Sequence, residues 1–319
     1  MPKSGPTASR ARGRRERDAA CAIAQAAAVM GDWWSLLIVR EVARGRHRFD
    51  VLLRELGISR KVLTERLAHL VAHDVLRRVP YQDRPVRHEY RLTDAGLALT
   101  SVLISMQDWA DRWVLGDGSL TGVAPDDGAT AHRVHALLGA TIPELTLPST
   151  PRPQDAGTDR DAGTDQDAGM DVVDGEARAT VIFAYPATGI PAPLPPEWGE
   201  IPGAAGCTLE NRLFRDAAGE FAAVRVALRG VSTQRPDEQA AFATAERIGH
   251  PLLSDAELRL AAALRLPTFR AGQVVRLKRL ILIADPDRVV RHVIFPVLDV
   301  PEAVGESLRV ATALASGNS

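Results

Sequence analysis

Apolar residues between positions 49 and 72 recur at helical spacing in two adjacent runs. The first run extends from Phe49 to Leu56 and stops at Gly57, a residue type that commonly follows the end of a helix. The second run follows Ser59, a favourable helix N-cap, and carries its own apolar stripe at Leu63, Leu67, Leu70 and Val71. Two helices joined by a short turn that contains glycine predict a helix-turn-helix.

The hydrophobic period changes from helical to alternating beyond Asp74. Two alternating runs, 76–81 and 86–92, flank the sequence Asp-Arg-Pro and predict a β-hairpin. A hairpin placed directly after the second helix is a wing. The predicted fold class of this region is therefore an α+β winged helix-turn-helix.

Further helices are predicted on both sides of this region. An alanine-rich segment from Cys21 to Met30 and a segment capped by Asp32 precede it. A last helix, capped by Thr93-Asp94, has apolar residues three and four apart at Leu99, Leu103, Met106, Ala110 and Trp113. A small domain cannot cover this stripe alone, so we expect it to form the seam of a homodimer whose two-fold symmetry matches a palindromic DNA site.

Positive charge is concentrated on the second helix and the hairpin. The helix begins Ser59-Arg60-Lys61, which combines a capping hydroxyl, free backbone N–H groups and two cations at the end that enters a major groove. Base contacts are expected from Ser59, Arg60, Lys61 and Thr64. Phosphate and wing contacts are expected from Arg48, Arg66, Arg77, Arg84 and Arg87. The predicted partner is double-stranded DNA.

Strand-like and helical runs alternate in the second half of the chain. The β-rich runs are ATVIFAY, VRVALRGVS, VRLKRLILIAD and VVRHVIFPV, and the helical runs are 237–248, 255–264 and 300–313. This alternation predicts an α/β sandwich around a central sheet. The earlier segment HRVHALLGATIPELTLPST resembles the first strand of the same domain.

An acidic repeat interrupts this second domain near its start. Residues 151–176 contain a six-residue repeat that begins DAGTDR and carry eight acidic residues against two arginines, which predicts a disordered insertion in a surface loop. The expected domains are a disordered basic arm, a DNA-binding and dimerisation domain, a linker, and an α/β domain that contains the insertion; their bounds are 1–18, 19–116, 117–131 and 132–315.

Composition separates the two halves and narrows their chemistry. Residues 1–120 carry 20 Lys and Arg against 14 Asp and Glu, whereas the other 199 residues carry 19 against 26. No apolar run approaches the ~20 residues of a membrane span, and the N-terminal residues lack the apolar stretch of a signal peptide, so we expect a cytoplasmic protein without a membrane partner. His132 and His135 have no companions that complete a metal-ligand set, and no P-loop or GxGxxG occurs. Neither a metal nor a cofactor is expected.

Residues 20–115 resemble a known family through four motifs. GDWWSLLIVRE, RFDVLLREL, ISRKVLTERL and YRLTDAG occur in the order and spacing of the HxlR family of bacterial winged helix-turn-helix regulators. The resemblance implies homodimeric, sequence-specific DNA binding and transcriptional control. It also implies a redox-sensing role for Cys21, because several members sense electrophiles or oxidants through a cysteine just ahead of the first helix. The alternative is that Cys21 persists as a small buried hydrophobic residue.

The second cysteine, Cys207, lies between the sequence PGAAG and a helical run. A cysteine in the first turn of a helix is close to unpaired N–H groups and the positive end of the helix dipole, which stabilise thiolate over thiol. A peroxide-reactive sulfur requires this stabilisation. The two cysteines lie in different halves, so no disulfide framework is implied.

A second resemblance covers about Val134 to Leu308. IPGAAGCTLENRLFRD, HPLLSD and KRLILIADPDRVVRHVIFPV are similar to a thioredoxin-fold peroxiredoxin of the AhpC/TSA type. The resemblance implies that Cys207 is the peroxidatic nucleophile and that Arg279 steadies thiolate and peroxide. Relatives often have a resolving cysteine where this chain has Arg212, and a peroxide-binding threonine where it has Ala204. These departures argue against turnover but allow one oxidation to sulfenic acid; a relic cysteine kept by packing is the alternative.

The combined hypothesis is a redox-responsive transcriptional regulator with a peroxide or electrophile as its signal. Oxidation of Cys207, passed to Cys21 or across the dimer as a disulfide, would shift the spacing of the two recognition helices. Two alternatives stay open. One is a one-cysteine thiol peroxidase that carries a DNA-binding module, and the other is a regulator whose second domain only dimerises or binds a small ligand.

Overall fold

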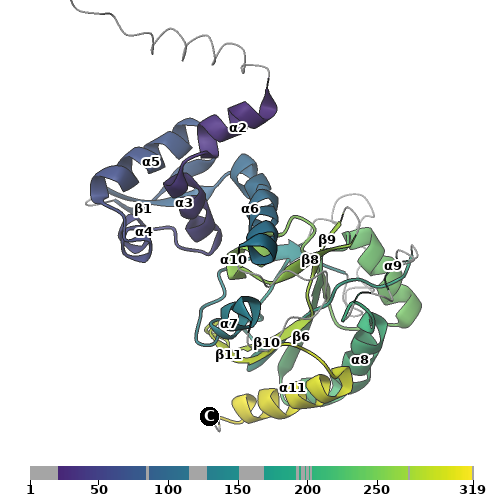
Figure 1. Cartoon of the computed structure of the whole chain (residues 1–319). Coiled ribbons are helices and arrows are strands. Elements are labelled where there is room, and N and C mark those ends of the chain that lie inside the picture. The colour runs from purple at the N-terminus through teal and green to yellow at the C-terminus, as the bar shows by residue number, and fades with distance from the viewer. Residues whose placement is uncertain are drawn as a thin grey trace, which may run out of the picture. The chain divides into compact units, whose positions relative to one another are not determined.

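The computed structural model describes residues 21–83, 86–114, 128–150, 169–191, 194, 198, 201, 203–271 and 274–317. These residues belong to two compact units, Met1–Leu99 and Thr100–Ser319. The division falls inside one helix, α6 (Asp94–Trp113). Figure 1 shows the helices and strands of each unit.

The N-terminal unit is a winged helix-turn-helix, as predicted. Its elements before α6 are α2 (Ala22–Met30), α3 (Trp33–Ala43), α4 (Phe49–Leu56), α5 (Arg60–Ala72), β1 (Leu76–Asp83) and β2 (Val86–Leu92). Gly57 ends α4 in the left-handed region with a φ of 60°. Ser59 begins α5 by accepting a hydrogen bond at Oγ from the Val62 N–H, 3.3 Å away. The apolar pattern and the two caps therefore give the helix bounds expected from the sequence.

The core of this unit joins α3, α4 and α5 to the hairpin. Its fully buried side chains include Ile38, Leu52, Leu63, Leu67 and Leu70. Strands β1 and β2 pair antiparallel from Leu76↔Leu92 to Asp83↔Val86, with a bulge between Pro80 and Gln82.

A buried acidic residue in α3 was not anticipated. Glu41 is 2% exposed and forms ion pairs with Arg40 at 2.6 Å, with Arg44 at 3.5 Å and with Arg46. Burial opposes its ionisation, but the three guanidinium groups outweigh that effect and hold the pKa of Glu41 below its ordinary value. This cluster ties the end of α3 to the turn that leads into α4.

The C-terminal unit is an α/β sandwich. After α6 its helices are α7 (Ala129–His135), α8 (Cys207–Ala223), α9 (Pro236–Glu246), α10 (Arg259–Leu264) and α11 (Val300–Ala315). Its strands are β3 (Thr146–Pro148), β4 (Gly169–Asp171), β5 (Ala179–Ala184), β6 (Val226–Ser232), β7 (Leu252–Ser254), β8 (Thr268–Ala271), β9 (Val274–Leu277), β10 (Leu280–Ala284) and β11 (Val290–Ile294).

Five of these strands form the central mixed sheet in the order β11-β10-β5-β6-β7. β5, β6 and β7 run parallel, and β10 pairs antiparallel with both β5 and β11. Side chains of β5 alternate between two cores: Val181 and Phe183 pack with residues of α8 and α11, whereas Ile182 packs with residues of α7 and α10. The sheet is thus covered on both faces, as in a thioredoxin-like fold (Figure 1).

Some expectations about the start of this unit were wrong. Residues 129–131, predicted as linker, form the first turn of α7, and HRVH belongs to that helix rather than to a strand. The predicted disordered insertion extends too far, because residues 169–171 form β4 and Val172 and Val173 are buried in the core. These segments are covered by distant parts of the chain, which local composition does not reveal. The basic arm at 1–18 and residues 151–168 lie outside the described residues.

Within the described residues, no single helix is long and apolar enough to cross a membrane. The pair α2 and α3, bent by 78° at the break between them, meets the length and composition criteria only when its two helices are taken together.

Candidate functional site

The candidate DNA-binding residues of α5 are grouped at its exposed N-terminal end. Ser59, Arg60, Lys61 and Thr64 are all exposed. The hydroxyl of Thr64 donates to the Arg60 carbonyl oxygen at 2.8 Å, so in this conformation it is used within the helix. Arg77 and Arg87 are exposed on the two strands of the wing. Arg84 lies outside the described residues.

Three of the predicted DNA contacts are engaged by acidic residues. Arg48 donates to Glu89 at 3.2 Å and also lies over the ring of Tyr81. Arg60 lies 3.6 Å from the Asp50 carboxylate in an exposed pair.

Arg66, which is half-buried, lies 3.4 Å from Asp32, the residue that caps α3. A duplex phosphate would compete with these carboxylates for the guanidinium groups. Each arginine would therefore contribute less to DNA affinity than an unpaired cation would.

The second candidate site is centred on Cys207, the first residue of α8. Gly206 precedes it in the left-handed region, with a φ of 98° that favours glycine. The sulfur lies 3.4 Å from Arg279 Nη2, and Cys207 donates from Sγ to the Ala204 carbonyl oxygen at 3.4 Å. The structure thus brings together the two residues, Cys207 and Arg279, that were predicted for the peroxide chemistry.

Arg279 is itself held by two further acceptors. Its guanidinium forms a buried ion pair with Glu210, one turn into α8, and donates to the Ala205 carbonyl oxygen at 2.9 Å. Glu210 is fully buried and Arg279 is 2% exposed. Burial raises the pKa of Glu210 to about 7, although Arg279 acts in the opposite direction.

The protonation of Cys207 differs from the expectation. Burial raises the pKa of its thiol above the ordinary value, and the negative charge of Glu210 adds to this effect, while Arg279 and the Ala187 backbone N–H oppose it. Only 3% of the residue is exposed. The position of Cys207 at a helix N-terminus therefore does not by itself lower the pKa of its thiol, because the effect of burial exceeds that of the nearby donors.

The two departures noted in the sequence have distinct structures. Arg212 forms a two-pronged ion pair with Glu246 of α9, at 2.6 and 2.9 Å. Ala204 packs without exposure in an apolar cluster with Trp198 and Phe269. The site therefore has an ion pair in place of a second thiol, and a methyl group in place of a hydroxyl.

Cys21 is the N-cap of α2 and is exposed. The interpretation of Cys21 as a buried hydrophobic residue is therefore wrong for this conformation. Its side chain makes no capping hydrogen bond. The described residues contain no group of three or more His, Cys, Asp or Glu side chains that could hold a metal ion.

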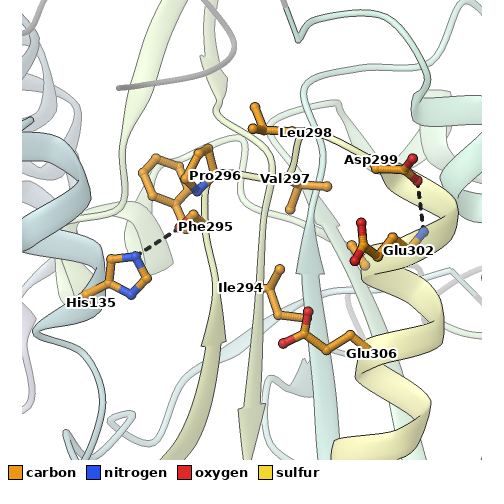
Figure 2. Close-up of a pocket in the computed structure, with 10 residues that line it drawn as sticks. His135, Ile294, Phe295, Pro296, Val297, Leu298, Asp299, Glu302 and Glu306 are labelled. Carbon is orange, nitrogen blue, oxygen red and sulfur yellow. Dashed lines mark hydrogen bonds between the residues drawn. The ribbon is translucent and has the colours of Figure 1, made fainter. Parts of the chain in front are cut away.

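A pocket of about 440 Å³ opens beside the start of α11, in the same unit as Cys207 (Figure 2). Its polar groups support the fold: His135 is hydrogen-bonded to the Phe295 carbonyl oxygen at 2.9 Å, and Asp299 caps α11 through the Glu302 N–H at 2.9 Å. Glu306 pairs with His292 at 2.7 Å. His135, Asp299 and Glu306 thus have partners within the fold, and neither Cys207 nor Arg279 lines this pocket.

Comparison with known families matches each unit separately. Residues 29–117 match the HxlR-like helix-turn-helix family, and residues 201–293 match the AhpC/TSA family. An HTH-type transcriptional regulator of Synechocystis is 36% identical over 111 residues, which are 33% of this chain and 82% of that relative. A Mycobacterium tuberculosis relative named as a peroxiredoxin is 35% identical over 137 residues, which are 43% of this chain and 80% of that relative.

The chain belongs to both families. Its N-terminal unit is HxlR-like and its C-terminal unit is peroxiredoxin-like. An HTH-type transcriptional regulator of Mycobacterium bovis is 42% identical over 92 residues, which are 29% of this chain. The chain spans 58% of the length of that regulator.

The sequence did not reveal three residues that shape the thiol site. In the sequence, Glu210 is one of several charged residues in a predicted helix and nothing distinguishes it from the others. Only the fold places it against Arg279. Trp198 and Ala187 contribute through a hydrogen bond to Ala204 and through a backbone N–H, respectively. No spacing rule identifies such contacts from the chain alone.

Proposed function

We propose that this chain is a DNA-binding transcriptional regulator of the HxlR type whose binding responds to oxidation of Cys207 in its peroxiredoxin-like unit. The observation that supports a response to oxidation is the position of Cys207 at the start of α8, with Arg279 Nη2 3.4 Å from its sulfur. DNA binding is supported by the winged helix-turn-helix, in which the start of α5 is exposed and cationic. The proposed location is the cytoplasm, where such a regulator meets chromosomal DNA.

The proposed DNA contacts are those derived from the sequence. Ser59, Arg60, Lys61 and Thr64 approach the base edges, and Arg48, Arg66, Arg77, Arg84 and Arg87 approach phosphates. The exposure of Lys61, Arg77 and Arg87 supports this assignment. The proposed domain bounds are those of the sequence, with the linker ending before α7 and the insertion ending before β4.

We propose a homodimer that binds a palindromic operator. Four large apolar side chains follow one another on α6 at spacings of four, three and four residues and are exposed: Val102, Met106, Trp109 and Trp113. Such a stripe is costly in water and supports a seam with a second copy. Replacement of Trp109 and Trp113 by aspartate should give monomers in sedimentation experiments and weaken operator binding.

The proposed oxidation consumes one peroxide. The Cys207 thiolate attacks the outer oxygen of a hydroperoxide; an S–O bond forms, the O–O bond breaks, and the leaving alkoxide takes a proton to become an alcohol or water. The sulfur is oxidised to sulfenic acid and the peroxide is reduced. The raised pKa of Cys207 and the ion pair at Arg212 favour a slow, single oxidation over rapid turnover.

The test uses labelled duplexes that the reduced protein selects from a random pool. Anisotropy titrations with and without one equivalent of hydrogen peroxide should give different affinities for the wild type and for Cys21→Ser, and equal affinities for Cys207→Ser. An unchanged affinity in the wild type overturns redox regulation. Many turnovers of peroxide with an external thiol, lost in Cys207→Ser, would instead support the thiol peroxidase alternative.

A further inference from the structure

The carbonyl oxygen of Ala204 accepts hydrogen bonds from two side chains at the Cys207 site. Trp198 donates from its indole Nε1 at 3.1 Å, and Cys207 donates from Sγ at 3.4 Å. Ala204 itself is fully buried, so bulk solvent does not reach this oxygen. The protonation of the sulfur and the position of the indole are therefore linked through one acceptor atom.

The indole is held firmly by the same apolar cluster that surrounds the sulfur's backbone partners. Trp198 is 6% exposed and packs with Ala187, Ala204 and Phe269, its ring centroid 6.2 Å from that of Phe269 on β8. The Ala187 backbone N–H is a hydrogen-bond partner of Cys207. Ala187 and Ala204, whose backbone groups act on the sulfur, thus belong to the same buried cluster as the indole.

Two turn hydrogen bonds connect Trp198 to Ala204 along the chain. The Ile201 N–H donates to the Trp198 carbonyl oxygen at 3.3 Å, and the Ala204 N–H donates to the Ile201 carbonyl oxygen at 3.1 Å. The carbonyl that faces the sulfur is therefore linked through the backbone to the residue that carries the indole.

A carbonyl oxygen that faces a sulfur favours the thiol in two ways. It accepts the S–H hydrogen bond, and its partial negative charge repels a thiolate. A second donor on the same oxygen draws off part of that charge, which weakens both effects. When the sulfur ionises, its proton passes to solvent, and the oxygen keeps the indole N–H as a partner.

We propose that Trp198 is a positioning residue for Cys207: its indole N–H engages the shared Ala204 carbonyl and so determines how readily the sulfhydryl gives up its proton. The inference rests on the proposed function only in treating Cys207 as the reactive sulfur. The proposed effect of Trp198 on the sulfur is indirect, because it acts through the Ala204 carbonyl alone.

The test is the ionisation of Cys207 in Trp198→Phe, made in the full chain with Cys21→Ser so that one thiol titrates. Phenylalanine keeps an aromatic ring in the cluster and removes the N–H donor. The ultraviolet absorbance of the thiolate should rise at a pH higher by roughly 0.5–1 unit, which is a threefold to tenfold smaller thiolate fraction below the midpoint. A folded variant with an unchanged midpoint overturns the proposal.

Two further variants separate the hydrogen bond from packing. Trp33→Phe, at an exposed tryptophan outside the proposed dimer seam, should leave the midpoint unchanged. Phe269→Leu loosens the indole's neighbour but keeps the N–H, so it should shift the midpoint less than Trp198→Phe. An equal shift in Phe269→Leu would assign the effect to packing and overturn the role of the N–H.

A spectroscopic test needs no change at Trp198 and serves if that variant does not fold. Tryptophan emission of the Cys21→Ser chain should change with pH at the thiolate midpoint, and the change should vanish in Cys207→Ser. Emission that is flat through the thiolate midpoint overturns the proposal. The two proposals can fail separately. If the thiol titrations behave as expected but peroxide does not change the affinity for DNA, the proposed function is overturned and this inference stands.

Discussion

The Arg279 guanidinium lies 3.4 Å from the Cys207 sulfur and at the same time forms a buried ion pair with the next turn of α8. One cation therefore serves a thiol and the Glu210 carboxylate. The carboxylate uses part of the positive charge that would otherwise stabilise a thiolate, which is one reason why the pKa of Cys207 is raised.

Arg279→Met should raise the pKa of Cys207 further, because the cation that opposes burial is gone. We expect alkylation of Cys207 at neutral pH to slow by about tenfold, equivalent to one pKa unit. The free energy of unfolding should fall by about 3–5 kcal/mol, since Glu210 would stay buried without its partner. Both quantities are measured in a Cys21→Ser background, by timed alkylation and by urea denaturation.

A second variant controls this result. Adding Glu210→Gln to Arg279→Met replaces a carboxyl group that could stay buried only by taking up a proton, so part of the lost stability should return while alkylation stays slow. If the double variant is no more stable than Arg279→Met, the ion pair is not the origin of the loss.

Glu41→Gln should destabilise the HxlR-like unit by about 3 kcal/mol at neutral pH, because three arginines lose the carboxylate they surround. The pKa of Glu41 is lowered on folding, so its contribution is present above the unfolded value of about 4.5 and is lost as the pH falls through the folded value. The difference between wild type and variant should therefore shrink in acid. Denaturant titrations at several pH values measure it.

Glu65→Gln, an exposed acid on α5, is the matched control and should change stability little. An equal loss in both variants would contradict the assignment of a structural role to the buried cluster.

The sequence predicted the elements whose signals are local. Gly57 and Ser59 delimit α4 and α5 by backbone conformation and capping, and Cys207 begins α8 because a glycine-rich turn precedes a helical run. The burial of Glu41 and the raised pKa of Cys207 depend instead on which distant segments cover these residues. No window of sequence contains that information, so the candidate thiol site could be located but its protonation could not be predicted.

His250→Phe should stabilise the peroxiredoxin-like unit. The imidazole is buried edge-on against Phe183, and neither of its ring nitrogens has a hydrogen-bond partner among the described residues. An unsatisfied buried polar group costs about 1–3 kcal/mol, which an apolar ring of similar shape would not incur. Urea denaturation above pH 7 measures the gain.

The acid dependence of stability gives a second readout for His250. Burial, assisted by Arg215, lowers its pKa to about 3, so the unfolded chain binds a proton from about pH 6.5 downward while the folded chain does not. Stability should fall by about 1.4 kcal/mol per pH unit across this window, and His250→Phe should remove that slope. His132→Phe, at an exposed histidine of the same unit, should retain it.

Lys61 and Arg66 should differ in their effects on DNA binding, although both lie on α5. Lys61 is exposed at the start of the helix, whereas Arg66 is half-buried and lies 3.4 Å from the Asp32 carboxylate. Lys61→Ala should weaken binding and reduce the slope of log affinity against log salt by up to about 1, because a cation that reaches the base edges also lies close to the flanking phosphates. Arg66→Ala should reduce that slope less, because a phosphate must displace Asp32 to gain the same charge.

Anisotropy titrations of one selected duplex at four or more salt concentrations decide between these outcomes. Thermal denaturation of both variants controls for loss of fold, which Arg66→Ala could cause by releasing the α3 cap residue. Equal reductions in slope for the two folded variants would mean that Asp32 does not hold Arg66 in solution. A slope unchanged by Lys61→Ala would mean that the start of α5 does not approach the phosphates, and would remove this helix from the proposed DNA contact.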